Sequence, residues 1–176
     1  MSDPRLKGRV IWILMTARPQ NLSPDIRRPG RVGNLIIPVL DPTGDDRTAF
    51  IQWVLEDCLE TLPEIGSEDW RRINEATLGY SAAQFDALRD ELAAELEFLG
   101  EGEHGPIRLN TDQVIDIIEE QISADIETAR RVQELYALIN CTRKSLLPDG
   151  EKLVKAQVLK LKEEWAREIH LLQLAT

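Results

Sequence analysis

The stretch from Val10 to Leu40 reads VIWILM-TARPQNLSPDIRRPGRVGN-LIIPVL, two apolar runs joined by a polar, proline-rich connection. Both runs are rich in β-forming residues and contain no charge, which is typical of strands covered on both faces in a parallel sheet. Pro38 places the second run at a sheet edge or late in a strand. Because two strands do not make a stable sheet alone, we interpret them as the end of a larger α/β domain.

After Asp45 the apolar residues repeat with helical spacing, so the rest of the chain is predicted to be helical. Helices are expected to begin near Asp45, after the caps Ser67 and Ser81, and after Asn110 or Thr111. Two more are expected over 125–140 and 151–174, with a turn at 147–150 between them. The predicted parts of the chain are therefore 1–44, 45–122 and 123–176.

The bulk composition limits the class of protein. The chain is 43% hydrophobic and 30% charged, which is ordinary for a folded domain. Its formal net charge of -10 argues against nucleic acid or an anionic membrane as a partner. The run from Val10 to Met15 is too short to span a bilayer, so we expect a cytoplasmic protein.

Isolated reactive side chains do not form a recognisable site. Cys58 and Cys141 lie in apolar helical patterns and are expected to be buried free thiols. The two histidines have no partners spaced for zinc or for hydrolysis, and no metal site is expected. The remaining candidates are predicted to form solvated faces or core: Asp116, Glu119, Glu120 and Asp125; Arg130, Arg131, Arg143 and Lys144; Trp12, Trp53, Trp70 and Trp165.

Three short motifs follow one another along the chain. The first apolar run ends in Thr16-Ala17-Arg18-Pro19, and Arg28-Pro29-Gly30-Arg31 precedes the second run. Further on stands Gly79-Tyr80-Ser81-Ala82-Ala83-Gln84. In this order they resemble the sensor-1 motif, the arginine-finger segment and the lid motif of an AAA+ ATPase of the AAA subgroup. The resemblance covers about Arg9 to Ile122.

The resemblance implies a fold and a set of roles. The fold would be mostly α, with a two-strand remnant of an α/β P-loop core, a helical lid subdomain and a C-terminal helical extension. Thr16 would lie in the sensor-1 region, and Arg28 and Arg31 would be fingers acting on a neighbour's ATP. Gly79, Ser81 and Ala82 would lie beside the adenine. The complete protein would use ATP and Mg²⁺, form a homo-oligomeric ring and act on a protein substrate or partner.

The chemistry of the finger segment is that of a fixed cation. A planar, permanently charged guanidinium matches the charge that spreads over the γ-phosphate oxygens during phosphoryl transfer. Gly30 allows a sharp turn and Pro29 stiffens it, which would hold Arg28 and Arg31 at a set distance.

The chain departs from the family pattern at three points. It has no Gly-x-x-x-x-Gly-Lys-[Ser/Thr] loop to cradle phosphates. No apolar run ends in Asp-Glu ahead of Thr16, and Ala17 stands where an Asn would orient the attacking water. We therefore expect this chain alone neither to bind nor to hydrolyse ATP. It would be either a piece of a longer ATPase or a degenerate module.

A second reading belongs to a different class. The chain could be a non-enzymatic helical interaction module whose AAA-like segment is a remnant. Its working surface would then lie on the last helix, along Val154, Val158, Leu161 and Trp165, whose spacing suits a packing face or a short coiled-coil seam.

Overall fold

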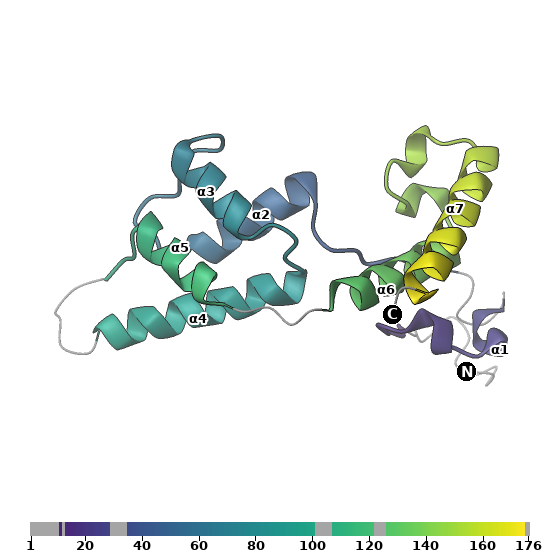
Figure 1. Ribbon diagram of the computed structural model, residues 1–176, viewed down its shortest axis with the longest axis horizontal. Helices are drawn as coiled ribbons and strands as arrows, with labels where there is room; N and C mark the ends of the chain where they lie inside the picture. The colour runs from purple at the N-terminus through teal and green to yellow at the C-terminus, as the bar shows by residue number, and fades with distance from the viewer. Residues whose placement is uncertain (1–10, 12, 29–34, 101–106, 122–125, 175–176) are drawn as a thin grey trace. The chain divides into compact units, whose positions relative to one another are not determined.

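The computed structural model describes residues 11, 13–28, 35–100, 107–121 and 126–174 (Figure 1). These residues are mostly helical, as expected. The α-helices are α1 (Pro24–Arg27), α2 (Gly44–Leu55), α3 (Glu68–Ala76), α4 (Ala82–Gly100), α5 (Thr111–Glu120), α6 (Glu127–Asn140) and α7 (Lys155–Leu174). Short 3-10 helices are η2 (Pro19–Asn21), η4 (Lys144–Leu146) and η5 (Gly150–Lys152).

The two apolar runs form no strand over the residues that the structure describes, so the two predicted strands are not confirmed. Ile13, Met15 and Val39 expose 79%, 92% and 88% of their surface. The physical reason is the missing neighbour, since a strand exists only when a second strand satisfies its backbone. In the second run, Ile36 finds a substitute: its N–H donates to Thr142 Oγ1 at 3.0 Å, and its carbonyl accepts from the Thr142 amide at 3.4 Å.

The chain divides into two compact units. Unit 1 comprises Met1–Leu40 and Asp125–Thr176, and unit 2 comprises Asp41–Ala124. Residues 1–40 of the first predicted part and 125–176 of the last thus fall in one unit, and contacts between η2 and α6 join these two segments. Each unit has a buried core of its own.

Unit 2 is built on α2, α3, α4 and α5. Phe85 of α4 is fully buried at its centre, stacked on Phe50 of α2 with ring centroids 5.5 Å apart and tilted against Tyr80 at 5.5 Å. Ile73 of α3 and Ile118 of α5 line the same small apolar gap as Phe85. A parallel bridge between Leu59 and Leu109 ties the segment after α2 to the one before α5. The core residues of unit 2 are Ile51, Val54, Leu55, Cys58, Leu59, Trp70, Ile73, Tyr80, Phe85, Leu88, Leu92, Leu109, Val114, Ile115 and Ile118.

Polar caps set where three of these helices begin. The Ser67 hydroxyl accepts from the Trp70 amide and starts α3. Ser81 and Gln84 exchange hydrogen bonds, with Ser81 N–H donating to Gln84 Oε1 at 2.9 Å, and so form a capping box ahead of α4. Asn110 and Gln113 do the same for α5, which decides between the two expected caps. All three positions agree with the sequence prediction.

Unit 1 centres on the packing of α6 against α7. Leu135 and Leu138 of α6 are buried together with Ile169 of α7 and with Cys141 and Leu147 from the connection between the two helices. Lys162 of α7 donates to the carbonyls of Ile139 and Cys141, both at 2.7 Å, and so satisfies backbone groups at the end of α6. The predicted turn at 147–150 is present, with Asp149 in the left-handed region at φ 51°.

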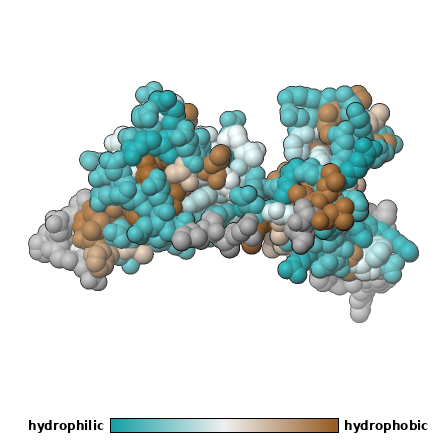
Figure 2. Space-filling model, viewed as in Figure 1, coloured by the Kyte–Doolittle hydropathy of each residue, from teal (hydrophilic) through white to brown (hydrophobic). Residues whose placement is uncertain are grey.

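Both cysteines are free and buried, as expected. Burial raises the pKa of the Cys58 thiol to about 11, so the thiol stays protonated at neutral pH. Apolar side chains also reach the surface of both units (Figure 2), among them Leu78 and Phe98 in unit 2 and Val154 and Leu174 in unit 1.

We expect Phe85→Ala to lower the free energy of unfolding of unit 2 by about 3–5 kcal/mol, because it removes a fully buried ring that joins several helices. Phe98→Ala on the same helix, where the ring is 72% exposed, should change it by less than about 0.5 kcal/mol. Urea denaturation measures both, and Phe85→Leu serves if the alanine variant does not fold. Equal losses at the two positions would contradict this description of the core.

Candidate functional site

The segment that carries the expected fingers begins with two short helical turns. Pro19 opens η2, and Ser23 caps α1 by accepting from the Asp25 amide at 3.3 Å. Pro24 occupies the first helical position, where its missing N–H costs nothing. Local chemistry therefore folds this connection into a defined turn, and η2 contacts α6.

Arg27 anchors the segment to the core of unit 1. Its Nη1 donates to Asn140 Oδ1 at 3.1 Å, across 113 positions of sequence, in a half-buried setting. Asn140 is itself held by donating its Nδ2 to the Tyr136 carbonyl at 2.7 Å. The Arg27 side chain is thus a structural tie between α1 and the end of α6, a role that the sequence did not indicate.

Arg28, the next residue, points away from such partners. Its side chain is 73% exposed and forms an ion pair with the exposed carboxylate of Asp25 at 3.3 Å. An exposed pair of this kind contributes at most about 1 kcal/mol, so the guanidinium is free to exchange partners. Arg31, the second expected finger, lies with Pro29 and Gly30 outside the described residues.

The sensor-1 region is also at the surface. The Thr16 hydroxyl is exposed and accepts from the Arg18 backbone N–H at 3.0 Å. This local turn fixes the backbone ahead of Pro19. Ala17 beside it is exposed and offers no polar side chain.

The lid motif forms the sharp entry into α4. Gly79 has φ 78°, a left-handed conformation that glycine adopts without strain. Tyr80 is buried and donates its hydroxyl to Gln121 Oε1 at 3.1 Å. Ser81 is occupied by the capping box, and Ala82 starts α4 with its side chain exposed. These residues belong to unit 2, whereas Thr16 and Arg28 belong to unit 1.

Arg47 holds the backbone just before that motif. Its Nη1 donates to the Thr77 carbonyl at 2.9 Å, and its Nη2 donates to the Asn74 carbonyl at 2.5 Å and to Thr77 Oγ1 at 3.0 Å. The guanidinium lies 5.7 Å from the centre of the Phe85 ring. Burial lowers the pKa of Arg47, but an arginine keeps its charge at neutral pH. A cation at the carboxyl end of α3 also matches the helix dipole.

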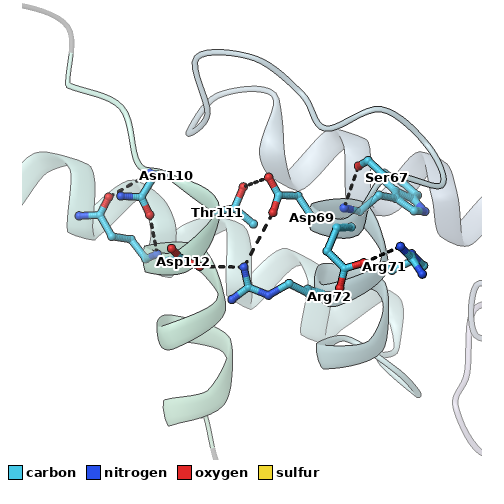
Figure 3. A network of polar contacts seen from close by, with 10 residues as sticks. Ser67, Asp69, Arg71, Arg72, Asn110, Thr111 and Asp112 are labelled. Atoms are coloured by element: carbon cyan, nitrogen blue, oxygen red, sulfur yellow. Dashed lines mark hydrogen bonds and ion pairs between the residues drawn. The ribbon is translucent and has the colours of Figure 1, made fainter.

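A network of polar side chains links the first turns of α3 and α5 (Figure 3). Arg72 pairs with Asp112 at 2.8 Å and lies 3.8 Å from Asp69, which accepts from the Thr111 hydroxyl at 3.2 Å. Hydrogen bonding to Asp112 raises the pKa of Arg72. All these groups are substantially exposed, so the network orients α5 on α3 and has no buried reactive group.

Within the described ranges, the remaining candidate residues do not come together to form a site. Asp116, Glu119 and Glu120 are exposed on α5, and Asp125 is outside those ranges. No group of three metal-ligating side chains occurs among the residues described. Arg131 is bound to Glu168 at 2.8 Å, which raises the Arg131 pKa, and Lys144 donates to the Leu153 carbonyl at 3.0 Å. Trp70 is buried, and Trp53 and Trp165 pack on the cores.

No family model, curated protein or solved structure matches this chain. None of the helices within the described ranges is both long enough and apolar enough to cross a membrane.

Arg27 and Arg28 should differ in what they do for the fold. We expect Arg27→Ala to lower the free energy of unfolding of unit 1 by about 1 kcal/mol, and Arg28→Ala by less than about 0.5 kcal/mol. A double-mutant cycle with Asn140→Ala should give a coupling energy of about 0.5–1.5 kcal/mol for Arg27 and none for Arg28. Hydrogen exchange of the α6 amides measures these values, and coupling of Arg28 to Asn140 would overturn the assignment.

Arg47→Ala should lower the free energy of unfolding of unit 2 by about 1.5–3 kcal/mol, because it leaves acceptors of Asn74 and Thr77 without their charged donor. Arg47→Lys keeps the charge but loses the fork, so it should recover part of this loss. The control is Arg71→Ala, whose exposed pair with Glu68 is worth little. Thermal unfolding compares the stability of the three variants. A loss of stability in Arg71→Ala as large as in Arg47→Ala would contradict the role given to the hydrogen bonds of Arg47.

Proposed function

We propose that the chain is the C-terminal portion of an AAA+ ATPase that supplies arginine fingers in trans and carries a nucleotide-responsive helical lid. The observation that carries the proposal is the order of three motifs: Thr16–Pro19, then Arg28–Arg31, then Gly79–Gln84, with apolar runs on both sides of the finger segment. On this proposal the two runs are the end of an α/β core. The high exposure of Ile13, Met15 and Val39 suits strands whose neighbours are supplied by another part of the protein.

The donors that the chain offers fit part of a nucleotide site. Arg28 has a largely exposed guanidinium whose described ion pair, with Asp25, is weak. It can therefore turn to a phosphate without leaving a buried carboxylate unpaired. The sequence lacks the glycine-rich loop that would cradle the phosphates of a nucleotide bound to the same chain. Arg28 would therefore supply a cation to a site for ATP and Mg²⁺ that a neighbouring subunit forms.

The chemistry assigned to Arg28 is electrostatic. Negative charge spreads over the equatorial oxygens of the transferred phosphoryl group, and a guanidinium placed beside them stabilises that charge more than the ground state. The tie between Arg27 and Asn140 limits how far the segment can move, which lowers the entropy lost when Arg28 is positioned.

Unit 2 is the proposed lid. The turn at Gly79, the buried Tyr80 and the capped start of α4 form one rigid corner, held by Arg47. We propose that Gly79, Ser81 and Ala82 approach the adenine and that movement of unit 2 as a rigid body transmits the nucleotide state to a protein substrate. A homo-oligomeric ring is part of this proposal, because a finger acts on the next subunit.

The test uses a longer ATPase chain that contains this sequence together with a phosphate-binding region. Arg28→Ala and Arg31→Ala in that chain should each lower kcat by about 10³-fold or more, with folding unchanged. Arg71→Ala, an exposed arginine in unit 2, is the matched control and should keep full turnover. Adding the 176-residue chain should restore turnover to the Arg28→Ala enzyme in trans, and its own Arg28→Ala version should not.

Unchanged turnover in both finger variants would sink the assignment. The alternative is then a non-enzymatic helical interaction module. Val158 and Trp165 already pack on the core of unit 1. Val154, just before α7, and Leu159, Leu171 and Leu174 of α7 are exposed, so these residues would be the working surface. That alternative predicts no rescue in trans.

A further inference from the structure

Charge is divided unevenly between the two units. Between Asp41 and Ala124 the sequence has 21 aspartates and glutamates, five arginines and no lysine, a formal net charge of −16. The rest of the chain has 10 acidic residues against 16 lysines and arginines, a net charge of +6. The total of -10 therefore conceals one strongly acidic unit and one basic unit.

The arginines of unit 2 are all engaged inside it. They bind backbone carbonyls or carboxylates of the same unit: Arg47 to Thr77, Arg71 to Glu68, Arg72 to Asp112, Arg89 to Asp57, and Arg108 to the Asp57 carbonyl. The unit has no lysine and no sixth arginine to pair with its other carboxylates. The acidity of unit 2 is thus a property of its surface.

One groove brings such carboxylates beside an apolar floor. It has a volume of about 240 Å³ and lies between the end of α2 and the middle of α4. Buried Val54, Cys58 and Leu92 belong to its lining, together with Ala93 and Leu96. Asp86 and Asp90 stand one helical turn apart on α4 at its rim, both exposed, and neither pairs with a described cation.

Arg89 shows what kind of group this groove accepts. Its guanidinium lies 4.5 Å above the Trp53 ring and pairs with the Asp57 carboxylate. The side chain is two-thirds covered, with its guanidinium against an aromatic ring and beside a carboxylate. The groove therefore already contains one cation, that of Arg89. The carboxylates of Asp86 and Asp90 are available to bind a second cation.

The size of the groove decides between ligand classes. Pockets for small molecules and cofactors have volumes of about 300–1,000 Å³, whereas the volume of this groove is smaller. It suits one or two side chains inserted from another protein. Carboxylates above an apolar floor match a segment in which lysine or arginine alternates with leucine-like residues, as on an amphipathic helix.

We propose that this groove, with Asp86 and Asp90 at its rim, docks a basic amphipathic segment of a partner protein. The cation of the segment lies between the two carboxylates, and an apolar side chain of the segment covers Ala93 and Leu96. The proposal concerns a surface of unit 2 distant in sequence from the finger segment and needs no nucleotide. Its outcome is therefore separate from that of the ATPase assignment.

The experiment measures binding of a fluorescent peptide of leucine and lysine, patterned for an amphipathic helix, to the full chain by anisotropy. Asp86→Asn with Asp90→Asn should weaken binding about tenfold, since two rim charges are lost. Ala93→Trp, which fills the groove without changing charge, should weaken it by at least as much. Arg89→Gln frees Asp57 and should strengthen binding about twofold. Circular dichroism confirms that each variant is folded.

The matched control is Glu119→Gln with Glu120→Gln, which removes the same charge from exposed positions on α5. It should change binding by less than twofold. An equal loss in this control, or no effect of Ala93→Trp, would show attraction to net charge alone and overturn the proposal. A peptide that does not bind at low salt, where screening is weakest, overturns it as well.

Discussion

The packing of unit 2 depends on the fully buried ring of Phe85. Its ring meets Phe50 of α2 and Tyr80 of the turn before α4, and it shares an apolar gap with Ile73 and Ile118. The four helices of unit 2 do not hold their positions by local propensity, because most helical stability in proteins comes from tertiary packing. A single buried ring lies where side chains of α2, α3, α4 and α5 gather, and Arg47, placed over that ring, also binds the carbonyl of Thr77 at the end of α3.

Local features were the predictable part of the fold. Ser67, Ser81 and Asn110 were recognisable because the cap side chain and the backbone N–H that donates to it lie within three residues, so the sequence contains the whole interaction. The strands predicted for the two apolar runs are not confirmed, for the opposite reason. A strand is defined by its hydrogen-bonded neighbour, and Ile36 bonds to Thr142, a residue after α6, in place of a second strand. The composition of the run does not indicate that Thr142 is its hydrogen-bond partner.

The candidate site shows the same division. Arg27 and Arg28 are adjacent and chemically identical, and only Arg28 belongs to the finger motif. The structure separates them, because the turn at Ser23 directs Arg27 toward Asn140 and leaves Arg28 in solvent. The role of Arg27 could not be read from the sequence, since its partner is 113 positions away. The sequence did not indicate the role of Arg47 either. Its acceptors, at Asn74 and Thr77, are available to it only because α3 ends there.

The acidity of unit 2 bears on its stability as well as on its partners. Like charges held close together in a folded unit repel one another and weaken it, whereas the unfolded chain spreads them apart. The internal arginines relieve part of this repulsion, but each is used to fix geometry: Arg47 at the end of α3, Arg72 between α3 and α5, and Arg89 between α4 and the end of α2. A cationic segment bound at Asp86 and Asp90 removes repulsion that the unit cannot remove by itself. Binding there and folding of unit 2 are consequently linked, and whatever occupies the groove also stabilises the helices that form it.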